Sequence, residues 1–395
     1  MNIKLYNIGI HFIYLFLKIF YPFNKKIKFL VLEQQNLLEK IKSSTKNKKN
    51  IVWFHCSSLG EFEQGLPIIE AYEKKYSKHN ILVTFFSSSG INNYEKRKNN
   101  YMVHYLPFDT KKNAQNFLKI VKPIKCIFIK NEFWFNYINE IKRSKIPFYS
   151  VSTIFRKDQF IIKNKWCIKQ LSKITHFFVQ NQESALILNQ IGITQYSVFG
   201  DSRFDRVNNL VQNCYDMPLL NSFSRKKKTI IVGSSWKEDE VLLVDFIKKN
   251  KEYNYIIAPH ELNNLNELCT KTSGIVYSKV DKENIKDYNV IIIDKIGYLS
   301  NIYQYGDIAY IGGGFGKGIH NILEPIGFNL PVIFGPNYSK SNEAKELIKI
   351  RCAFTINSFS NLKDVIISIK KIDNKITQKY LQEKSGASQK IIANL

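Results

Sequence analysis

Short apolar runs alternate with polar stretches of helix length along most of this chain, and this alternation constrains the fold more than any other feature. The pattern is typical of parallel β-sheets covered by helices. It stops between Asp205 and Lys228, where Asn, Ser and a basic run indicate a linker, and then restarts. The sequence therefore predicts an α/β protein of two successive βα domains, with ligands in a cleft between them, beyond the carboxyl ends of the strands. The apolar runs are residues 51–55, 81–86, 125–129, 147–152 and 176–179 before the linker, and 229–233, 253–258, 290–294, 307–311 and 332–334 after it.

The N-terminal segment differs in kind from the rest. Residues 5–23 are dominated by Ile, Leu, Phe and Tyr, and lysines follow at positions 25, 26 and 28. A bilayer span takes about 20 mostly apolar residues, so this segment is marginal as a span. Its aromatic residues and trailing lysines favour a helix anchored in, or lying along, an anionic leaflet, with the bulk of the protein on the cytoplasmic side. An apolar helix packed on the domain is the alternative; no small-residue cleavage site follows, which disfavours a signal peptide.

The predicted organisation has four parts. A membrane-associating helix and linker occupy residues 1–49, and a first domain occupies residues 50–207. A linker at residues 208–228 leads to a second domain at residues 229–395.

Charge and cysteine content bound the function classes. The 395 residues carry a formal net charge of +25, mostly from lysine, in a chain also rich in Ile and Asn. AT-rich coding produces the same bias, so mutational drift and an anionic partner both remain open. The lysines are spread through the chain without a recognisable RNA- or DNA-binding module, so no nucleic-acid partner is expected. The six cysteines lack CxxC or metal-finger spacing, which favours a reduced, cytoplasmic protein without structural zinc.

Residues 312–336, GGGFGKGIHNILEPIGFNLPVIFGP, are predicted to form an anion site. A β-like run precedes the glycine turn and a helix-like stretch at residues 321–328 follows it, so the amides of the turn would face a phosphate at a helix N-terminus. Glu324 suits a ribose diol, because a carboxylate accepts two hydroxyl hydrogen bonds without a metal. Lys317 is either a phosphate ligand or a solvated side chain. The glycines expected near the phosphate are Gly313, Gly314 and Gly316.

A small polar turn at residues 56–60 follows the first predicted strand and opens a helix with Glu61 and Glu63 in its first turn. Acidic residues are common at helix starts, so composition alone leaves a structural role open. Position favours a function for Glu61, because it lies just past the carboxyl end of a strand, where it could act as a general base on an acceptor hydroxyl. Glu63 is predicted to be structural. Ser58 and Gly60 are candidate substrate contacts.

Six motifs then occur in a fixed order: WFHCSSLGEFEQGLPII, YLPFD, NEFWFN, GDSRFDRV, GSSWKEDE and residues 312–336. Together they resemble the 3-deoxy-D-manno-octulosonic acid (Kdo) transferase family, membrane-associated enzymes that add Kdo from CMP-Kdo to the lipid A precursor. The resemblance covers roughly residues 50–345. It implies a glycosyltransferase B fold with two Rossmann-like domains, the acceptor bound mainly by the first and CMP-Kdo by the second. It also implies a reaction that inverts the anomeric centre.

The resemblance implies roles for single residues. The family's essential glutamate matches Glu61 and its second motif glutamate matches Glu132, and both are expected to be catalytic. A structural pair of Glu132 with a base such as Arg203 is the alternative. Negative charge develops on the departing phosphate, so the site needs hydrogen-bond donors there. Arg203 or Arg206, with the N-terminal lysines, would hold the acceptor phosphates. The expected donor-side contacts are Ser234, Ser235, the glycine turn with Lys317, Asn321 and Glu324.

The implied partners are CMP-Kdo, the lipid A precursor and the cytoplasmic face of the cell inner membrane. No metal or other cofactor is expected, because the chain has no Asp-x-Asp and its glycine turn lacks the GKS or GKT ending of a P-loop. Another glycosyltransferase B enzyme acting on a nucleotide sugar and a membrane lipid acceptor is the alternative. It would share the glycine turn and Glu324 but would not need the SSLGE motif. The chain departs from the family at Lys130 and Asn131, where many members read Glu-Thr, and at residues 258–261, which read APHE where the family commonly has Arg-His-Pro.

Overall fold

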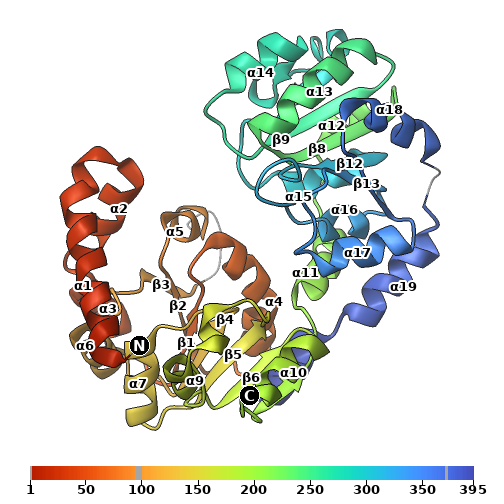
Figure 1. Cartoon of the computed structure of the whole chain (residues 1–395). Helices are drawn as coiled ribbons and strands as arrows, with labels where there is room; N and C mark the ends of the chain where they lie inside the picture. Colours follow the sequence, from red (N-terminus) through yellow and green to blue (C-terminus); the bar gives the residue numbers. More distant parts are fainter. Residues whose placement is uncertain (1, 95–99, 370–371) are drawn as a thin grey trace. The chain divides into compact units, whose positions relative to one another are not determined.

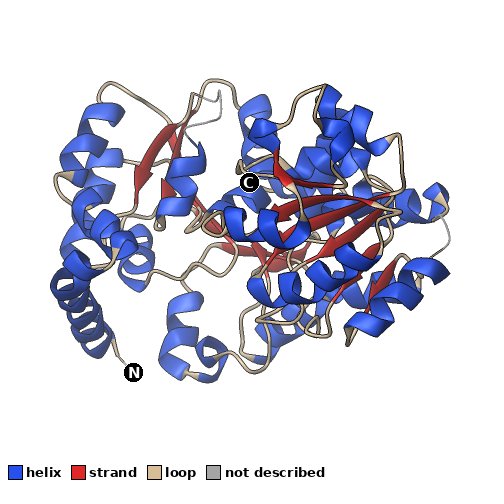
Figure 2. Ribbon diagram, turned by 90° about the horizontal axis from the view of Figure 1, so that it is seen from above, coloured by secondary structure: helices blue, strands red, loops and turns tan. Residues whose placement is uncertain are grey.

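A computed structural model describes residues 2–94, 100–369 and 372–395. The chain forms two compact units (Figure 1). Unit 1 contains the chain up to Arg206 together with Lys384–Leu395, and unit 2 contains Val207–Glu383. Each unit is built on one seven-stranded parallel sheet flanked by helices (Figure 2). The alternation of apolar and polar stretches therefore corresponds to two Rossmann-like βα units, as predicted.

The sheet of unit 1 has the strand order β3-β2-β1-β4-β5-β6-β7. Its central strands are apolar runs buried on both faces, and all five residues of β1 are buried. The order changes direction between β1 and β4, which is the switch point where such sheets bind ligands. The strands are β1 (Ile51–His55), β2 (Asn80–Phe85), β3 (Met102–Tyr105), β4 (Lys125–Ile129), β5 (Phe148–Thr153), β6 (His176–Val179) and β7 (Tyr196–Val198). The helices are α1 (Ile3–Phe20), η1 (Tyr21–Phe23), α2 (Lys25–Glu33), α3 (Leu37–Thr45), α4 (Leu59–Lys75), α5 (Ser88–Tyr94), α6 (Lys111–Val121), α7 (Phe135–Arg143), α8 (Phe160–Lys163), α9 (Lys165–Leu171), α10 (Gln182–Gln190) and α20 (Ala387–Ala393).

The sheet of unit 2 has the order β10-β11-β9-β8-β12-β13-β14, with its switch point between β8 and β12. The strands are β8 (Thr229–Ser235), β9 (Asn254–Pro259), β10 (Ile275–Val276), β11 (Val290–Ile292), β12 (Ile308–Ile311), β13 (Val332–Phe334) and β14 (Ala353–Thr355). Helix α11 (Arg203–Gln212) leads from unit 1 into unit 2. The other helices are α12 (Pro218–Ser224), α13 (Lys237–Lys249), α14 (Leu265–Thr272), η2 (Tyr277–Lys279), η3 (Ile285–Asp287), α15 (Leu299–Ile302), η4 (Tyr303–Tyr305), α16 (Leu323–Gly327), α17 (Asn342–Lys349), α18 (Phe359–Ser368) and α19 (Asn374–Lys384).

Four strands were not predicted from the sequence, and they are the edge strands of the two sheets. Strands β3 and β7 close the sheet of unit 1, and β10 and β14 close that of unit 2. All four are only partly buried. An edge strand pairs on one side only and needs no continuous apolar run, so the signal that identifies central strands is missing there.

The chain between the sheets and its C-terminal end differ in detail from the predicted organisation. Helices α11 and α12 occupy much of the predicted linker. The predicted second domain runs to residue 395, whereas Lys384–Leu395 belongs to unit 1 in the structure. Helix α20 packs there against α4.

Helix α20 is held at both of its ends. Asp205 accepts hydrogen bonds from the N–H of Gly386 at 2.5 Å and of Ser388 at 2.7 Å, which caps the helix start. At the other end, Lys75 Nζ donates to the Ile392 carbonyl at 3.0 Å, and Lys125 donates to the Leu395 carbonyl. Asp205, from the GDSRFDRV motif, and helix α4, which follows β1, thus hold helix α20 against unit 1.

We expect Ile391→Ala to destabilise unit 1. The Ile391 side chain is 0% exposed, and truncating a buried Ile costs about 2–5 kcal/mol of the free energy of unfolding. Lys390→Ala on the exposed side of the same helix is the control and should change the free energy by less than about 0.5 kcal/mol. Urea unfolding monitored by amide hydrogen exchange would localise the loss to unit 1. Equal effects of the two substitutions would show that α20 contributes no packing.

Helix α1 lies with one face against unit 1. Tyr6 Oη donates a hydrogen bond to Asp109 Oδ2 at 2.5 Å. Two turns further along, the ring centroid of Tyr14 lies 4.9 Å from that of Phe108. The partly covered side chains at positions 3, 6, 7, 10, 14 and 17 follow the spacing of a single helix face. The helix is therefore seated along the unit over at least two turns.

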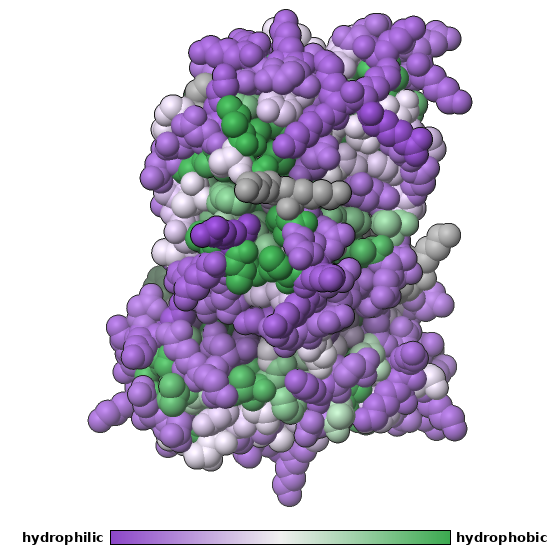
Figure 3. Space-filling model, turned by 90° about the vertical axis from the view of Figure 1, so that its right-hand side faces the viewer, coloured by the Kyte–Doolittle hydropathy of each residue, from purple (hydrophilic) through white to green (hydrophobic). Residues whose placement is uncertain are grey.

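The opposite face of α1 is apolar and exposed. Residues Ile3–Phe23 form a segment long and apolar enough, by length and composition, to cross a membrane, although soluble core helices and signal sequences can have the same character. By contrast, the molecular face drawn in Figure 3 is mostly hydrophilic, with scattered hydrophobic patches. The exposed apolar residues of the segment are Leu5, Ile8, Phe12, Ile13, Leu15, Phe16, Ile19, Phe20 and Phe23.

Candidate active site

Glu61 and Glu132 come together at the switch point of unit 1, because they follow the neighbouring strands β1 and β4. Ser58 caps helix α4, and its Oγ accepts from the Glu61 N–H at 3.4 Å. Lys130, directly after β4, has φ 67°, a left-handed turn that redirects the chain toward Glu132. Both carboxyl groups are more than half buried, so they interact in a medium of low polarity.

Ser57 joins the two carboxyl groups. Its N–H donates to Glu61 Oε2 at 2.6 Å, and its Oγ–H donates to Glu132 Oε2 at 2.5 Å. Trp134 Nε1–H is a further donor to Glu132 Oε2, at 2.8 Å. His55 Nε2 lies 3.8 Å from the same oxygen. Glu132 thus accepts more of these hydrogen bonds than Glu61 does.

The two glutamates share a proton unequally. Burial, and then the nearby charge of Glu132, raise the pKa of Glu61 to about 8. Burial also acts to raise the pKa of Glu132, but the interactions with His55, Ser57 and Glu61 outweigh it and lower that pKa. Two carboxylates so close cannot both ionise easily. Near neutral pH the pair therefore holds one proton, on Glu61, and one negative charge, on Glu132.

A buried hydrogen-bond network fixes the position of Ser57. Thr84 Oγ1 accepts from Trp53 Nε1–H at 2.7 Å and lies 2.9 Å from His55 Nδ1. His55 Nε2 lies 3.1 Å from Ser57 Oγ, whose proton is engaged by Glu132. These atoms are satisfied when Nε2–H donates to Ser57, because the Ser57 proton is already engaged by Glu132. Sequence reasoning missed this support for the site; its only trace in the sequence is a histidine at a strand end.

The remaining acceptor-side candidates lie close in sequence but have different environments. Arg203 donates to Asp201 Oδ2 from Nε at 2.8 Å and from a second guanidinium nitrogen at 2.7 Å, so both nitrogens share one oxygen, and its side chain is 30% exposed. Arg203 therefore pairs with Asp201, whereas the contacts of Glu132 are those given above. Glu63 pairs with Arg206 at 2.5 Å. Gly60 is exposed, and a Cβ added there would meet no atom within 4 Å.

In unit 2 a buried carboxylate ties the end of β8 to the glycine turn. Asp239 is 0% exposed. Its Oδ2 accepts from the Trp236 N–H at 2.9 Å and the Gly313 N–H at 2.8 Å, and its Oδ1 accepts from Tyr310 Oη–H at 2.8 Å. Ser235 Oγ donates to Glu240 at 3.1 Å. Asp239 was absent from the sequence-derived candidates, although it belongs to the GSSWKEDE motif.

The glycine turn after β12 packs directly on the end of β8. A Cβ on Gly312 would lie 2.3 Å from the Ser234 carbonyl oxygen, and Gly313 has φ +90°, so neither position tolerates a side chain. The N–H groups of Gly316 and Gly318 both donate to the Gly313 carbonyl, at 3.0 and 3.1 Å. The N–H groups of Gly313 and Gly316 thus have partners inside the protein.

The stretch after the turn contains a helix of five residues, α16, shorter than the expected stretch at residues 321–328. Asn321 Oδ1 accepts from the Leu323 N–H at 3.1 Å, and its Nδ2 donates to Glu324 Oε1 at 3.2 Å. Glu324 is 9% exposed. Asn321 and Glu324 are therefore brought together, with the carboxylate held by the amide.

Three aromatic rings form a stack beside the turn. The ring centroid of His260 lies 4.2 Å from Trp236 and 4.6 Å from His320. Trp236 Nε1–H donates to His320 Nε2 at 2.7 Å. Burial, and then His260, lower the pKa of His320 to about 4, which keeps that ring neutral and able to accept. The loop at residues 258–261, whose contacts could not be predicted from the sequence, thus contributes the His260 ring to this stack.

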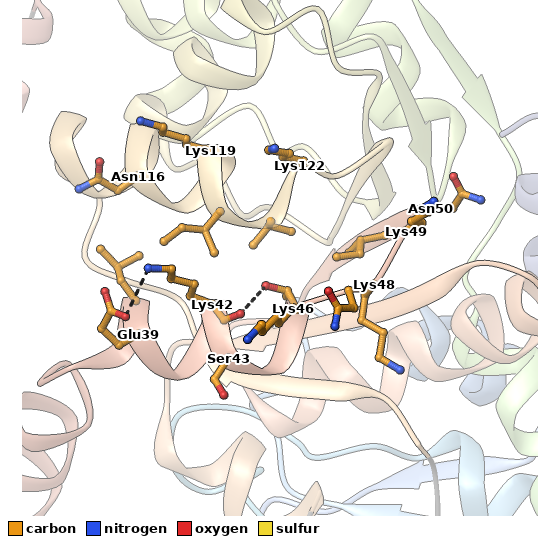
Figure 4. Close-up of a pocket in the computed structure, with 16 residues that line it drawn as sticks. Glu39, Lys42, Ser43, Lys46, Lys48, Lys49, Asn50, Asn116, Lys119 and Lys122 are labelled. Atoms are coloured by element: carbon orange, nitrogen blue, oxygen red, sulfur yellow. Dashed lines mark hydrogen bonds and ion pairs between the residues drawn. The ribbon is translucent and has the colours of Figure 1, made fainter.

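A cavity of about 1110 Å³ lies elsewhere in unit 1, at the amino ends of the strands (Figure 4). Several of its lysines are at the C-terminal ends of α3 and α6, where cations interact favourably with the helix dipole, so the cluster has a structural explanation. Lys42 lies 3.8 Å from Glu39, the acidic residue drawn at the rim. The lining lysines are Lys42, Lys46, Lys48, Lys49, Lys119 and Lys122.

Among the residues that the structure describes, no group of three or more His, Cys, Asp or Glu side chains could hold a metal ion. The six cysteines carry free thiols.

Residues 33–206 match the family model for 3-deoxy-D-manno-octulosonic-acid transferase (kdotransferase). A 3-deoxy-D-manno-octulosonic acid transferase of Aquifex aeolicus is 29% identical over 315 residues, which cover 78% of this chain and 82% of that protein. One of Rickettsia felis is 27% identical over 351 residues, 85% of this chain and 75% of that protein. The chain is therefore similar to Kdo transferases over most of its length, and residues 33–206 match the model of that family. It is accordingly a glycosyltransferase, as the motifs predicted.

Further similarities concern a bifunctional relative and the fold. A bifunctional glycosyltransferase/methyltransferase of Fusobacterium nucleatum is 29% identical over 344 residues, 82% of this chain, and the chain spans about half, 52%, of that protein's length. A putative UDP-N-acetylglucosamine 2-epimerase from Listeria monocytogenes has a TM-score of 0.60 and 12% identity, covering 87% of this chain and 95% of that one. A glycosyltransferase from Rickettsia africae has a TM-score of 0.56 and 12% identity, covering 87% and 97%. These structures share the fold alone, and they confirm the predicted glycosyltransferase B class.

Proposed function

We propose that this glycosyltransferase transfers Kdo from CMP-Kdo to the lipid A precursor with inversion at the anomeric carbon. The match to the Kdo transferase family model and the similarity to Kdo transferases support Kdo as the transferred sugar. The observation that carries the chemistry is the carboxyl pair of Glu61 and Glu132 at the switch point of unit 1. In that pair Glu61, positioned by Ser57, has its pKa raised to about 8.

The proposed mechanism uses Glu61 as a general base. The acceptor hydroxyl oxygen attacks the anomeric carbon while Glu61 takes the hydroxyl proton. The bond from that carbon to the phosphate oxygen breaks, and CMP leaves with the bonding electron pair. A carboxylate with a raised pKa is a stronger base than an ordinary one, and the charge of Glu132 supplies part of that basicity. Because Glu61 must first lose its proton, turnover should increase as the pH rises toward about 8.

On the donor side, we assign the CMP phosphate to the end of β8 and the glycine turn. Developing negative charge on the leaving phosphate calls for fixed hydrogen-bond donors. The N–H groups of Gly314 and Lys317 have no hydrogen-bond partner among the described residues and are the amides that we assign to this role. The remaining proposed donor contacts are Ser234, Ser235, the Lys317 ammonium, Asn321, and Glu324 for the ribose.

On the acceptor side, we assign phosphate binding to Arg203. Asp201 Oδ2 accepts from two nitrogens of the guanidinium, which limits its rotation and orients it for a phosphate. Ser58 and Gly60 border Glu61 in sequence and are the proposed contacts for the acceptor sugar.

Mass spectrometry can test this function directly. A tetra-acylated lipid A precursor would be incubated with the purified, detergent-solubilised protein and freshly generated CMP-Kdo, without added divalent metal in the transfer step. A mass gain of one or more Kdo units is expected. No gain, with a known Kdo transferase active in parallel, would refute the donor and acceptor assignment. It would favour another nucleotide sugar with the same fold, to be identified by a binding screen.

We also propose that the enzyme works on the cytoplasmic side of the cell inner membrane, with α1 lying along the bilayer surface. Contacts of Tyr6 and Tyr14 keep α1 against unit 1 over two turns, which leaves its exposed apolar face to enter the headgroup region. The lysine-lined cavity of Figure 4 and the lysines that follow η1 add attraction to anionic lipid.

Vesicle binding is therefore expected to weaken with salt. The screening length falls from about 10 Å at 0.1 M to about 3 Å at 1 M, so the electrostatic part should be lost while the apolar part remains. Flotation with phosphatidylglycerol vesicles, with phosphatidylcholine vesicles as the control, would measure both parts. Salt-independent binding to the anionic vesicles would contradict an electrostatic contribution.

A further inference from the structure

We propose that Tyr6 and Asp109 are positioning residues for the carboxyl pair, so that the apolar N-terminal helix is part of the active-site structure as well as a membrane contact. This inference rests on the proposed function, because it takes Glu61 and Glu132 as the groups that carry out the transfer. It also gives a role to the YLPFD and NEFWFN motifs beyond their single catalytic glutamate.

Asp109 caps helix α7 from a distant position in the sequence. It is fully buried, and its Oδ2 and Oδ1 accept from the N–H groups of Asn136 at 3.2 Å and Tyr137 at 3.1 Å. The residue that precedes the helix, Trp134, makes no side-chain cap of its own. Asp109 therefore provides the carboxylate that a helix start usually takes from its own N-cap residue. The start of α7 is fixed by this side chain.

Helix α1 completes the coordination of Asp109. Tyr6 Oη–H donates to Asp109 Oδ2 at 2.5 Å, and the Tyr6 ring centroid lies 5.0 Å from that of Phe135, the first residue of α7. The neighbouring Asn7 Oδ1 accepts from Asn136 Nδ2 at 2.8 Å. Burial raises the pKa of Asp109 to about 6, and the hydrogen bond from Tyr6 is the leading interaction that opposes this rise. Loss of the Tyr6 hydroxyl would therefore favour protonation of Asp109 and weaken its cap.

The start of α7 is in turn linked to the carboxyl pair. Trp134 immediately precedes the helix, and its Nε1–H donates to Glu132 Oε2 at 2.8 Å. Its ring lies 4.7 Å from that of Phe86 and 5.9 Å from that of His55, which limits how it can move. A displacement of α7 would thus move the Trp134 donor away from Glu132. Because the charge of Glu132 raises the pKa of Glu61, the basicity of Glu61 would change with it.

The test compares Tyr6→Phe with Tyr14→Phe, a substitution on the same docked face whose ring contacts Phe108. Both variants keep the exposed apolar face, so vesicle binding should be unchanged. For Tyr6→Phe we expect kcat to fall on the order of tenfold, since a misplacement of about 1 Å can cost up to about a hundredfold. The rising limb of its kcat–pH profile should shift, with the KM values little changed. Tyr14→Phe should match the wild type in all of these.

The kcat–pH profile also depends on the other titratable groups around the carboxyl pair and around Tyr6. Glu61 is faced by Glu132, Lys130 and the Cys56 thiol, and Tyr6 and Asp109 are near Cys167 and Tyr137. Tyr6→Phe removes only the Tyr6 hydroxyl and Tyr14→Phe only the Tyr14 hydroxyl, and both leave the other groups in place, so a shift specific to Tyr6→Phe reports the link through Tyr6. A second readout, the NMR resonance of the Trp134 indole N–H, assigned with Trp134→Phe, should move in Tyr6→Phe and stay in Tyr14→Phe.

The outcomes separate this inference from the proposed function. If the wild type transfers Kdo and Tyr6→Phe keeps the wild-type kcat and pH profile, the positioning role is overturned, whatever the indole resonance does. If the wild type transfers no Kdo, the proposed function fails, and the indole resonance alone decides whether α1 is linked to Trp134; an unmoved resonance then overturns the link. A lower kcat with a shifted profile, specific to Tyr6→Phe, supports the inference.

Discussion

Glu61→Gln should lower kcat by about 10²- to 10⁴-fold and leave the affinity for CMP-Kdo nearly unchanged. The amide cannot accept the hydroxyl proton of the acceptor, whereas the proposed CMP-Kdo contacts belong to unit 2. Single-turnover Kdo transfer and calorimetric CMP-Kdo binding would measure the two effects separately. Glu70→Gln, an exposed change on the same helix, is the control and should behave as the wild type. Full activity of Glu61→Gln would eliminate it as the base.

The same substitution should be structurally conservative because Glu61 is protonated in the free enzyme near neutral pH. The Gln oxygen can accept from the Ser57 N–H, and its amide nitrogen can donate to Glu132, as the protonated carboxyl does. A loss of activity in this variant would therefore report lost chemistry and not unfolding.

Stability against pH gives an independent check of the raised pKa. The folded state holds the Glu61 proton up to a pH of about 8, whereas the unfolded chain releases it near the ordinary glutamate pKa of about 4.3. Between these two pKa values the folded state binds more protons, so this contribution to the free energy of unfolding falls as the pH rises. Glu61→Gln lacks this titration. The wild type should therefore lose stability relative to the variant between about pH 5 and pH 8, and a constant difference would argue against a raised pKa.

Sequence reasoning reached the central strands and the glutamates, and its failures have physical causes. Runs such as residues 51–55 and 125–129 are buried on both faces, so they must be continuously apolar and are visible in the sequence. The edge strands and the five-residue helix α16 carry no comparable signal. Helix α20 joins unit 1 through its Asp205 cap and two buried Ile side chains, contacts that join residues 181 or more positions apart and leave no local pattern.

The candidate site shows the same division. Glu61 could be predicted from the sequence because it follows a predicted strand, whereas Glu132 was predicted only through the family resemblance. Their mutual contact follows from strand order, because β1 and β4 are neighbours although a whole βαβ segment separates them. The supporting groups are Ser57 and Trp134. Their role cannot be predicted from the sequence, because it depends on contacts with Glu132 that form only when the loops after β1 and β4 lie side by side. Asp239 was hidden for the same reason, since an acidic residue in the first turn of a helix has a sufficient local explanation.

Asp239→Ala is expected to destabilise unit 2 strongly, and Asp239→Asn should destabilise it clearly less. The carboxylate accepts from three donors, the N–H groups of Trp236 and Gly313 and the hydroxyl of Tyr310, in a site with no exposure. Alanine leaves all three donors without an acceptor, at a cost of about 3–5 kcal/mol in the free energy of unfolding. Asparagine keeps most of this network, because its oxygen can accept from the two backbone N–H groups while its NH₂ group donates to the Tyr310 hydroxyl oxygen, so only the Tyr310 proton loses this acceptor.

Replacing Asp239 should also weaken CMP binding, because Asp239 holds two segments of the proposed phosphate site. Its Oδ2 fixes the Gly313 N–H and the end of β8 on one oxygen, so both segments of the proposed phosphate site lose their common anchor when it is replaced. CMP affinity of Asp239→Ala should fall by about tenfold or more, the amount that about 1.4 kcal/mol represents. Asp245→Ala, exposed on the same helix, is the matched control and should leave both stability and affinity unchanged. Urea unfolding and calorimetric CMP binding would measure the two effects. If Asp239→Ala keeps the stability and CMP affinity of the wild type, the Asp239 carboxylate is not what organises the turn. The donor site would then depend on the glycine backbone and on the aromatic stack of Trp236, His260 and His320.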